Sequence, residues 1–281
     1  MNWLILAGVF WAAAFITNIV LANSRWSHTT LVRLTIPVLF GVTILVIWEA
    51  LVHAFGISAA ILPAPSDVGA TFMNSTDMLW EDFRQTVLKG ALRGYVIGAV
   101  AALVTAVLID RSPFLTQGLL PIGNFVAALP IVGVAPILVS WFGFDWHSKA
   151  AVVVIMVFFP ILVNTVQGLR EADAMQRDLM KTYASSYMQT LIKLRFPAAL
   201  PFVFNGLKIA ATLALIGAIV AEYFGSPTRG MGFRISTGVG SLSIDLVWAE
   251  IAVAAMAGTA FYGVVAWIEK KVTYWHPSQR G

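Results

Sequence analysis

The sequence predicts an all-α, polytopic membrane protein, and three observations lead to this fold class. The chain has 281 residues, of which 59% are hydrophobic and only 11% are charged, and its mean hydropathy is +0.82. A soluble domain usually carries about 25% charged residues, so this chain has too little charge to cover a water-facing surface. The apolar residues also form runs of about 20, the length an α-helix needs to cross a hydrocarbon core about 30 Å thick.

The remaining composition excludes several classes of function. The net charge of +4 does not indicate nucleic-acid binding, because the basic residues fall between apolar runs and form no basic face. The absence of cysteine excludes disulfides, cysteine-ligated metals and thiol catalysis. The histidines lie far apart without metal-ligand spacing, so we expect no metal site; they are His28, His53, His147 and His276.

Seven hydrophobic segments are predicted to cross the membrane. The first could be a signal peptide, but it lacks a basic segment before it and a clear small-residue cleavage site, so we expect a retained helix. In chain order the predicted spans are 3–22, 34–55, 87–109, 114–142, 150–169, 202–223 and 246–268.

The segment between the second and third spans predicts a helix outside the membrane core. Pro63 and Pro65 indicate an extended entry, and Ser66 or Asp67 would be the N-cap of the helix that follows. Residues 68–83 are amphipathic and too polar to span, so we expect them to lie along the membrane interface.

The fourth span, 114–142, contains Pro121, Pro130 and Pro136. Interrupted helices are tolerated at membrane depth only where protein or a water-filled cavity takes up the freed backbone groups, so this segment is expected to line a cavity. Residues 225–245 are rich in glycine and serine and predict a loop or re-entrant piece. The spacing Gly225-x4-Gly230-x-Gly232 is weak as a phosphate motif, and we interpret it as a flexible outer loop that a delivery protein contacts.

A polar island, residues 170–201, separates the fifth and sixth spans. Leu179, Met180, Tyr183 and Tyr187 follow at i, i+1, i+4 and i+8 and predict one apolar-aromatic stripe on a helix pair, which could lie in a groove on a partner. The alternative is a solvated loop without a partner, which would not need such a stripe. The charged residues of the island are Arg170, Glu171, Asp173, Arg177, Asp178, Lys181, Lys193 and Arg195.

The distribution of Lys and Arg predicts the orientation of the chain. If the polar island lies in the cytoplasm and the spans alternate, eleven of the 18 Lys and Arg fall on the cytoplasmic side and six on the outer side. Because positive charge favours the cytoplasmic side, we expect the N-terminus outside and the C-terminus inside.

The island resembles the cytoplasmic loop of permease subunits of ATP-binding-cassette (ABC) importers, which carries Glu-Ala-Ala, three residues, Gly, nine residues and Ile-x-Leu-Pro. Asp178, Leu179 and Met180 stand for Glu-Ala-Ala, and Leu194, Phe196 and Pro197 for Ile, Leu and Pro. Ala184 stands for the glycine, although only glycine enters positive φ at no cost, so the turn between the two short helices tests the resemblance. The ATPase-coupling residues carried over are Asp178, Leu179, Met180, Lys181, Tyr183, Ala184, Tyr187, Leu194, Phe196 and Pro197.

The surrounding segments 61–68, 158–173 and 197–225 are similar to the nitrate/sulfonate/taurine branch of binding-protein-dependent permeases. The resemblance covers about 37–271 and implies a type I, six-helix importer permease core plus one extra N-terminal transmembrane helix. The implied division is 1–30 (extra helix and cytoplasmic link), 31–86 (first core helix and interfacial helix), 87–272 (permease core with coupling loop 170–197) and 273–281 (cytoplasmic tail).

The resemblance also implies the working partners. The chain has no G-x-x-x-x-G-K-[ST] loop, so it would bind no cofactor, and ATP and Mg would be held by a cytoplasmic ABC ATPase dimer. A second permease copy, most simply a homodimer, an extracytoplasmic substrate-binding protein and membrane lipid complete the set, with no nucleic acid. Alternating access across a bacterial cytoplasmic (inner) membrane would import a small polar or anionic solute, such as a sulfonate, nitrate, or a vitamin or pyrimidine precursor.

Two other function classes find less support. A self-contained secondary carrier would need coupling-ion groups near mid-membrane, and the sequence puts almost none there. An intramembrane enzyme would need a catalytic set, and neither H-E-x-x-H nor G-x-S-x-G occurs. We therefore expect a transport subunit that is not itself an enzyme.

Polar residues inside the spans are candidates for the translocation pathway or a gate, because ionisable groups at membrane depth are costly and usually functional. Glu222 would line the pathway or be an interfacial carboxylate paired with Arg229 or Arg234. Amides and hydroxyls could orient a solute or form helix–helix hydrogen bonds. The candidates are Asn124, Pro130, Ser140, Asn164, Gln167 and Glu222.

Two further carboxylates receive structural interpretations. Glu49 lies one turn before His53, and a local pair is favoured over a transport site. Glu250, near the outer start of the last span, is interpreted as an interfacial carboxylate.

Overall fold

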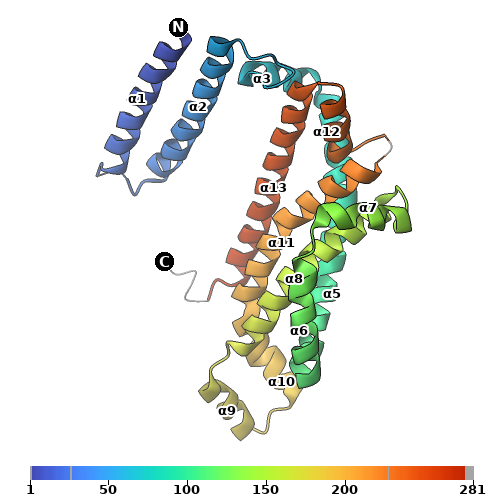
Figure 1. The fold of residues 1–281 in the computed structure, drawn as a ribbon. Helices are drawn as coiled ribbons and strands as arrows, with labels where there is room; N and C mark the ends of the chain where they lie inside the picture. The colour runs from blue at the N-terminus through green and yellow to red at the C-terminus, as the bar shows by residue number, and fades with distance from the viewer. Residues whose placement is uncertain (1, 26, 227, 276–281) are drawn as a thin grey trace. The chain divides into compact units, whose positions relative to one another are not determined.

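The structure is a computed structural model that describes residues 2–25, 27–226 and 228–275 (Figure 1). The described residues form helices and no strands, which confirms the all-α class. Six helical segments are long and apolar enough to cross a membrane, which confirms a polytopic membrane protein. They are Trp3–Ala22, Thr30–Phe55, Thr76–Arg111, Trp146–Arg170, Tyr187–Gly225 and Ile244–Val272.

The helices are α1 (Asn2–Ala22), α2 (Thr30–Phe55), α3 (Pro65–Asn74), α4 (Thr76–Phe83), η1 (Arg84–Ala91), α5 (Leu92–Arg111), α6 (Pro113–Ala127), α7 (Ile131–Phe142), α8 (Trp146–Arg170), α9 (Ala174–Thr182), α10 (Tyr187–Thr190), η2 (Leu191–Arg195), α11 (Phe196–Gly225), α12 (Met231–Gly240) and α13 (Ile244–Val272). The two elements η1 and η2 are π-helices, in which hydrogen bonds join residues five apart. The chain divides into two compact units, one of Met1–Thr76 with Thr237–Glu250 and one of Asp77–Ser236 with Ile251–Gly281.

The first unit contains the hairpin of α1 and α2 and the short helix α3. Glu49 accepts hydrogen bonds from His53 Nε2 (2.8 Å to Oε1) and from the hydroxyl and backbone N–H of Ser66 (2.7 and 3.0 Å). The local Glu49–His53 pair is therefore confirmed, and the same carboxylate fixes the start of α3. The predicted N-cap, Ser66 or Asp67, was two or three residues too late. Ala64 is the N-cap, and Pro65 occupies the first helical position, where its missing N–H costs nothing.

The second unit is built around α5, α8 and α11, which run side by side (Figure 1). Small residues face one another where these helices cross, as is common for helices packed in membranes. A Cβ added to Gly94 of α5 would lie 2.5 Å from Val153 Cβ, and one added to Gly168 of α8 would lie 2.7 Å from Phe202 Cβ. Close helix contact therefore needs glycine at both positions.

The predicted fourth span, 114–142, is interrupted, as its prolines predict, and consists of two shorter helices. α6 has 15 residues and α7 has 12, against the roughly 20 that a span needs. Pro130 separates them as the N-cap of α7, with an extended backbone that α-helix does not allow. Pro121 and Pro136 lie inside α6 and α7 and do not end them.

Three other predicted boundaries also differ from the structure. Residues 68–83 belong to two helices, and the second, α4, continues through η1 into α5. The sixth span begins at Tyr187, 15 residues before the predicted 202, because Pro197 falls in the first turn of α11 and does not interrupt it. Part of the predicted loop 225–245 is the helix α12. The division into 1–30, 31–86, 87–272 and 273–281 stays a prediction, and residues 276–281 of its tail lie outside the described chain.

Candidate functional site

The first half of the polar island is an exposed helix, α9. Asp173 Oδ1 caps it by accepting a hydrogen bond from Met175 N–H at 2.9 Å. No residue of α9 is buried, and Met175 and Leu179, one turn apart, are 78% and 56% exposed. Tyr183 continues this face and is 75% exposed. Exposed apolar side chains on a helix, with charged residues on either side of them, are suited to binding in a groove on a partner protein.

The turn after α9 has the backbone conformation that the family pattern provides with glycine. Ala184 has a φ of +50°, in the left-handed region. The N–H of Ala184 donates to Lys181 O (2.8 Å) and that of Ser185 to Met180 O (3.0 Å), so the last carbonyls of α9 are satisfied. The turn is therefore made with alanine, at a cost of about 1–2 kcal/mol for a non-glycine residue.

The second half of the island is fixed to the end of α5 by the Asp110 carboxylate and to the end of α8 by the Leu169 carbonyl. Arg195 donates two hydrogen bonds to Asp110, Nη1 to Oδ2 (2.7 Å) and Nη2 to Oδ1 (2.6 Å), while its Nε donates to Leu169 O (2.9 Å). The Tyr187 hydroxyl donates to the same carboxylate at 2.8 Å, and the Arg111 guanidinium lies 5.1 Å from the Tyr187 ring. We call Asp110, Tyr187 and Arg195 the Asp110 anchor.

The anchor changes the predicted apolar stripe. Tyr187 is partly buried against the cluster that contains Leu169 and Leu191. It is therefore not exposed with Leu179 and Tyr183, and the exposed stripe continues toward Met175 instead. Leu194 and Pro197 are half-buried near the start of α11, and Phe196 is exposed there. The predicted coupling residues thus divide into an exposed group on α9 and an anchored group on α10 to α11.

Asp178 and Lys181 form an ion pair on the open surface of α9, with 2.9 Å between Oδ1 and Nζ. The hydrogen bond and charge of Lys181 hold the pKa of the Asp178 carboxyl below its usual range. Both side chains are largely exposed, so the pair contributes little to folding.

The predicted pathway residues lie in several different environments. Asn164 of α8 donates to Pro160 O (2.8 Å) and accepts from Asn205 Nδ2 of α11 (3.0 Å), so it makes the helix–helix hydrogen bond that was one of its two interpretations. Gln167 is exposed one turn further along α8, and Pro130 and Ser140 are exposed at the two ends of α7. The side chain of Asn124 lies outside the described residues.

A recess of about 190 Å³ borders the break between α6 and α7. It lies against the middle of α8, where Pro160 removes a backbone hydrogen bond. The interrupted segment therefore lines a hollow, as its prolines predict. The lining residues are Val126, Leu129, Ile131, Ile155, Met156, Pro160 and Leu213.

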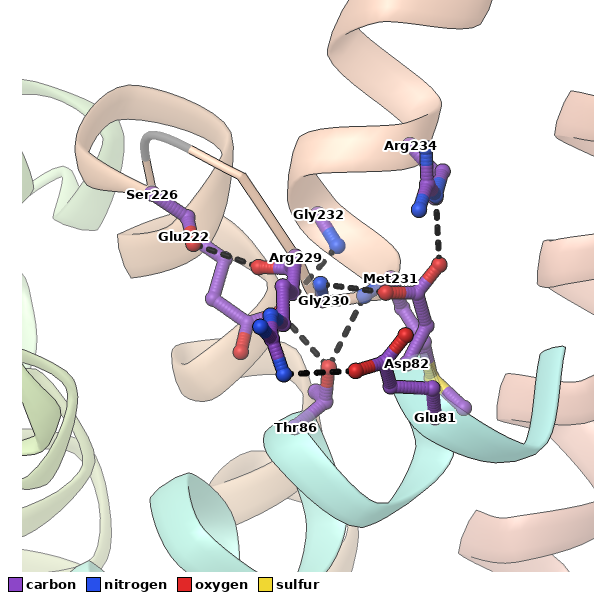
Figure 2. A network of polar contacts seen from close by, with 10 residues as sticks. All are labelled: Glu81, Asp82, Thr86, Glu222, Ser226, Arg229, Gly230, Met231, Gly232 and Arg234. Carbon is purple, nitrogen blue, oxygen red and sulfur yellow. Dashed lines mark hydrogen bonds and ion pairs between the residues drawn. The ribbon is translucent and has the colours of Figure 1, made fainter. Parts of the chain in front are cut away.

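A buried network holds the beginning of α12 (Figure 2). Glu222, at the C-terminal end of α11 and only 1% exposed, accepts a hydrogen bond from the Thr86 hydroxyl at 2.6 Å and from Gly232 N–H at 3.3 Å. Thr86 in turn accepts from Met231 N–H at 2.9 Å. These side chains satisfy N–H groups of the first helical turn that have no partner within the helix.

Asp82 binds the same turn from α4. Its Oδ1 accepts from Gly230 N–H and its Oδ2 from Arg234 Nε, both at 2.6 Å (Figure 2). Gly230 has a φ of +112°, and a Cβ there would overlap the Glu222 carboxylate, so both the backbone and the space require glycine. The two carboxylates therefore face the positive end of the α12 helix dipole.

Lys149 completes the network from the start of α8. Its side chain is 1% exposed, and its ammonium donates to Gly225 O at 2.8 Å and to Phe144 O. The charge of Lys149 acts on Glu222, so the buried acid has a buried base nearby. We use "buried network" for Asp82, Thr86, Lys149 and Glu222 with the backbone of 230–232.

Glu222 is buried and pairs with neither of the two arginines that were suggested for an interfacial carboxylate. Arg229 and Arg234, its suggested partners, form ion pairs with Glu81 (2.6 Å) and Asp82 (2.6 Å). Glu250 is also buried, at 0% exposure, which its interfacial interpretation did not anticipate.

Sequence reasoning missed several residues of the anchor and the network: Asp82, Thr86, Asp110, Lys149 and Arg195. Most of them are charged residues at the edge of an apolar run, such as Lys149 before 150–169 and Asp110 after 87–109. A charged residue at the edge of an apolar run could have indicated a buried contact, but exposed interfacial charges also occur at such edges.

Comparisons with known proteins assign the chain to a family. The family described as "Binding-protein-dependent transport system inner membrane component" matches residues 94–274. This range includes the island, the anchor and most of the buried network.

Full-length relatives are similar over most of the chain. A "Probable ABC transporter permease protein" of Haemophilus influenzae is 32% identical over 237 residues, covering 84% of this chain and 96% of the relative. The riboflavin transport system permease protein RibX of Chloroflexus aurantiacus is 30% identical, with 84% and 88% covered. The formylaminopyrimidine transport permease protein ThiX of Halalkalibacterium halodurans is 28% identical, with 86% and 96% covered.

Proposed function

This chain belongs to the family of binding-protein-dependent transport system inner membrane components, which are ABC transporter permease subunits, and we propose that it carries a small polar or anionic solute into the cell by alternating access. As a permease it is a transport subunit and not an enzyme, and the family works with an ATPase and a substrate-binding protein. Family membership also decides against a self-contained secondary carrier. ATP and Mg would be bound by the partner ATPase.

The main support for the proposed coupling is that the exposed helix α9 is followed by a helical segment that is fixed to α5 through Asp110. Met175, Leu179 and Tyr183 offer an apolar face to the ATPase, while Tyr187 and Arg195 are tied to Asp110. α10, η2 and α11 form one continuous helical segment of 39 residues, about 58 Å long at 1.5 Å per residue. Movement of the ATPase at α9 would therefore reach the far end of α11.

At that far end the buried network would act as the outer gate. The first turn of α12 is held by hydrogen bonds from three side chains, Asp82, Thr86 and Glu222. A displacement of α11 would loosen some of these bonds, which supplies the differential contacts that a two-state change needs. The recess at the α6–α7 break would line the pathway between two permease copies. The segment 114–142 would contribute Asn124, Pro130 and Ser140 to this pathway, and α8 would contribute Asn164 and Gln167.

The names of the relatives bear on the solute, and the distribution of Lys and Arg bears on the orientation. Relatives named for riboflavin and formylaminopyrimidine favour a vitamin or pyrimidine precursor, and the branch resemblance favours a sulfonate or nitrate. The excess of Lys and Arg on the island side supports an island in the cytoplasm, with the N-terminus outside and the C-terminus inside the cytoplasmic (inner) membrane of a bacterial cell. A second copy of the chain would complete the permease as a homodimer.

The coupling proposal is tested by reconstituting the permease with its ATPase and measuring two quantities, ATPase retention on a tagged permease and solute uptake into vesicles. Leu179→Ala with Tyr183→Ala should lower ATPase retention at least tenfold, because the exposed apolar face is removed. Asp110→Asn should leave retention intact and lower uptake, because α9 remains while the anchor is weakened.

Arg177→Ala is the matched control, since it truncates a long side chain about half a turn from Leu179 on the same helix. It should retain the ATPase and transport. Unchanged retention in the Leu179→Ala/Tyr183→Ala variant would refute α9 as the docking helix, and unchanged uptake in Asp110→Asn would refute the anchor as the transmitting contact.

A further inference from the structure

A small recess next to the buried network is lined mainly by positive side chains. It has a volume of about 150 Å³ and is formed by Glu81, Arg84, Gln85, Lys89 and Arg229. Such a volume exceeds the space taken by a water molecule several-fold, so it can hold a tetrahedral oxyanion group. Three cations and one carboxylate leave a local excess of positive charge.

The π-helix η1 brings two of these cations together. In an α-helix, residues five apart point in different directions, since one turn holds 3.6 residues. In η1 the hydrogen-bonded turn is wider, as the bond from Leu92 N–H to Val87 O shows, and residues five apart come onto nearly the same face. Arg84 and Lys89 are spaced in this way and both line the recess.

The third cation comes from the segment before α12 and is held in place. Arg229 Nη1 lies 2.6 Å from Glu81 Oε1, and its carbonyl accepts a hydrogen bond from the Ser226 hydroxyl at 2.5 Å (Figure 2). Within the described part of the chain, Arg84 and Lys89 form no ion pair, so their charges remain open to a ligand.

We propose that Arg84, Gln85, Lys89 and Arg229 bind an oxyanion group, the phosphate of an anionic lipid or a free phosphate or sulfonate. The adjacent Trp80, which is 58% exposed and stacks on Phe83, indicates that the recess lies at the depth of the membrane interface, where lipid phosphates are found. Arginine and lysine near a membrane surface each add to the attraction of anionic groups. This site is separate from the island and does not depend on how transport is coupled.

The test uses the full chain with two ligands. In nanodiscs of phosphatidylcholine with and without phosphatidylglycerol, retention of each lipid is measured by native mass spectrometry, and in detergent inorganic phosphate is titrated by calorimetry. Arg84→Gln with Lys89→Gln should weaken the binding of phosphatidylglycerol or of phosphate by about 10- to 30-fold. Loss in the lipid arm identifies a lipid site, and loss in the phosphate arm alone identifies a site for a soluble anion.

Two variants keep the result interpretable. Lys270→Gln with Lys271→Gln removes the same charge from the end of α13 and should leave both affinities unchanged. Glu81→Gln removes the only carboxylate of the recess and should tighten binding about threefold. The proposal is overturned if the Arg84→Gln/Lys89→Gln protein, with an unaltered thermal midpoint, binds both ligands as the parent does, or if the α13 control weakens binding equally.

Discussion

The polar island and the buried network lie at opposite ends of the same helical segment, Tyr187–Gly225. The two regions differ in whether their charged and apolar side chains are exposed or buried. The island exposes Leu179 and Tyr183 and keeps a largely solvated ion pair beside them. The network buries Lys149 and Glu222 almost completely. Lys149 donates to backbone carbonyls and Glu222 Oε2 accepts from a hydroxyl and a backbone N–H, whereas Glu222 Oε1 has no hydrogen-bond partner among the described residues.

This difference suggests how the two ends divide their roles. Exposed apolar side chains contribute nothing to the folded state until a partner covers them, whereas buried charges are costly unless every partner is in place. Substitutions at the island should therefore affect association, and substitutions in the network should affect folding. The Asp110 anchor lies between these extremes, with Asp110 and Arg195 side chains 8% and 14% exposed.

The largest effect is expected for Lys149→Met. It removes the ammonium that serves Gly225 O and Phe144 O and leaves Glu222 without its buried countercharge, which should lower the free energy of unfolding by about 3–5 kcal/mol. Unfolding in detergent is measured by circular dichroism against denaturant. Lys89→Met, at an exposed lysine, should change it by less than about 0.5 kcal/mol. Equal effects of the two substitutions would remove the contrast between the ends.

Asp110→Asn should have an intermediate effect. The amide keeps one acceptor but loses the charge that Arg195 binds in bidentate form, so about 2 kcal/mol of stability should be lost. Amide hydrogen exchange of residues 187–195 should become faster while that of α9 does not change. Asp178→Asn is the control, because its pair with Lys181 is exposed, and rapid exchange in both variants would show that the anchor has no special role.

Ala184→Gly should stabilise the island slightly. Alanine at a φ of +50° carries a cost that glycine avoids, partly offset by the greater freedom of glycine in the unfolded chain, leaving a gain of about 1 kcal/mol. Slower amide exchange of residues 183–186 would report it. Ala174→Gly, in the first turn of α9, should instead destabilise, and a loss of stability in both variants would show that the turn is not strained.

The smallest effect is expected for Lys181→Ala. Without the ammonium, the pKa of Asp178 should rise toward its usual value, as followed by pH titration of its carboxyl carbon by NMR. Because the folded-state pKa is lowered, the contribution of this pair is present above the pKa of the unfolded chain and disappears as pH falls through the lowered pKa. The thermal midpoint near neutral pH should not change, and a clear decrease would mean that the island is part of the folded core.

Composition and hydropathy predicted the fold class and most of the spans. Whether a segment can cross a membrane depends on the hydropathy of its own residues and not on contacts with distant ones. The resemblance from Asp178 to Pro197 also located the turn of the island, and it left open whether Ala184 adopts the positive φ that the structure shows. The prolines predicted that the segment 114–142 is interrupted, but not which of them separates the helices, because Pro121 and Pro136 lie inside α6 and α7 and only Pro130 lies between them.

The contacts of the candidate site depended on distant parts of the chain. Glu222 was singled out, yet its partner Thr86 is 136 residues away, and nothing in the local sequence of either residue indicates the other. The spacing of Tyr187 in the island is the same whether its side chain is exposed on the stripe or bonded to Asp110. The hydrogen bond from α10 to Asp110 of α5 shows which of the two occurs. Pro197 predicts a helix boundary by its missing N–H, but it lies in the first turn of α11 directly after η2, and the helical segment continues through it.

The π-helices also have an evolutionary consequence. Each π-turn closes over one residue more than an α-turn, so η2 can be regarded as an α-helix that has accepted a single-residue insertion. Deleting one residue from Leu191–Arg195 would restore α-helical register and rotate Tyr187 by about 100° relative to α11. A lineage that lost this residue would have to replace the tyrosine contact with Asp110, so an insertion or deletion here should occur together with a change at position 110 or 187.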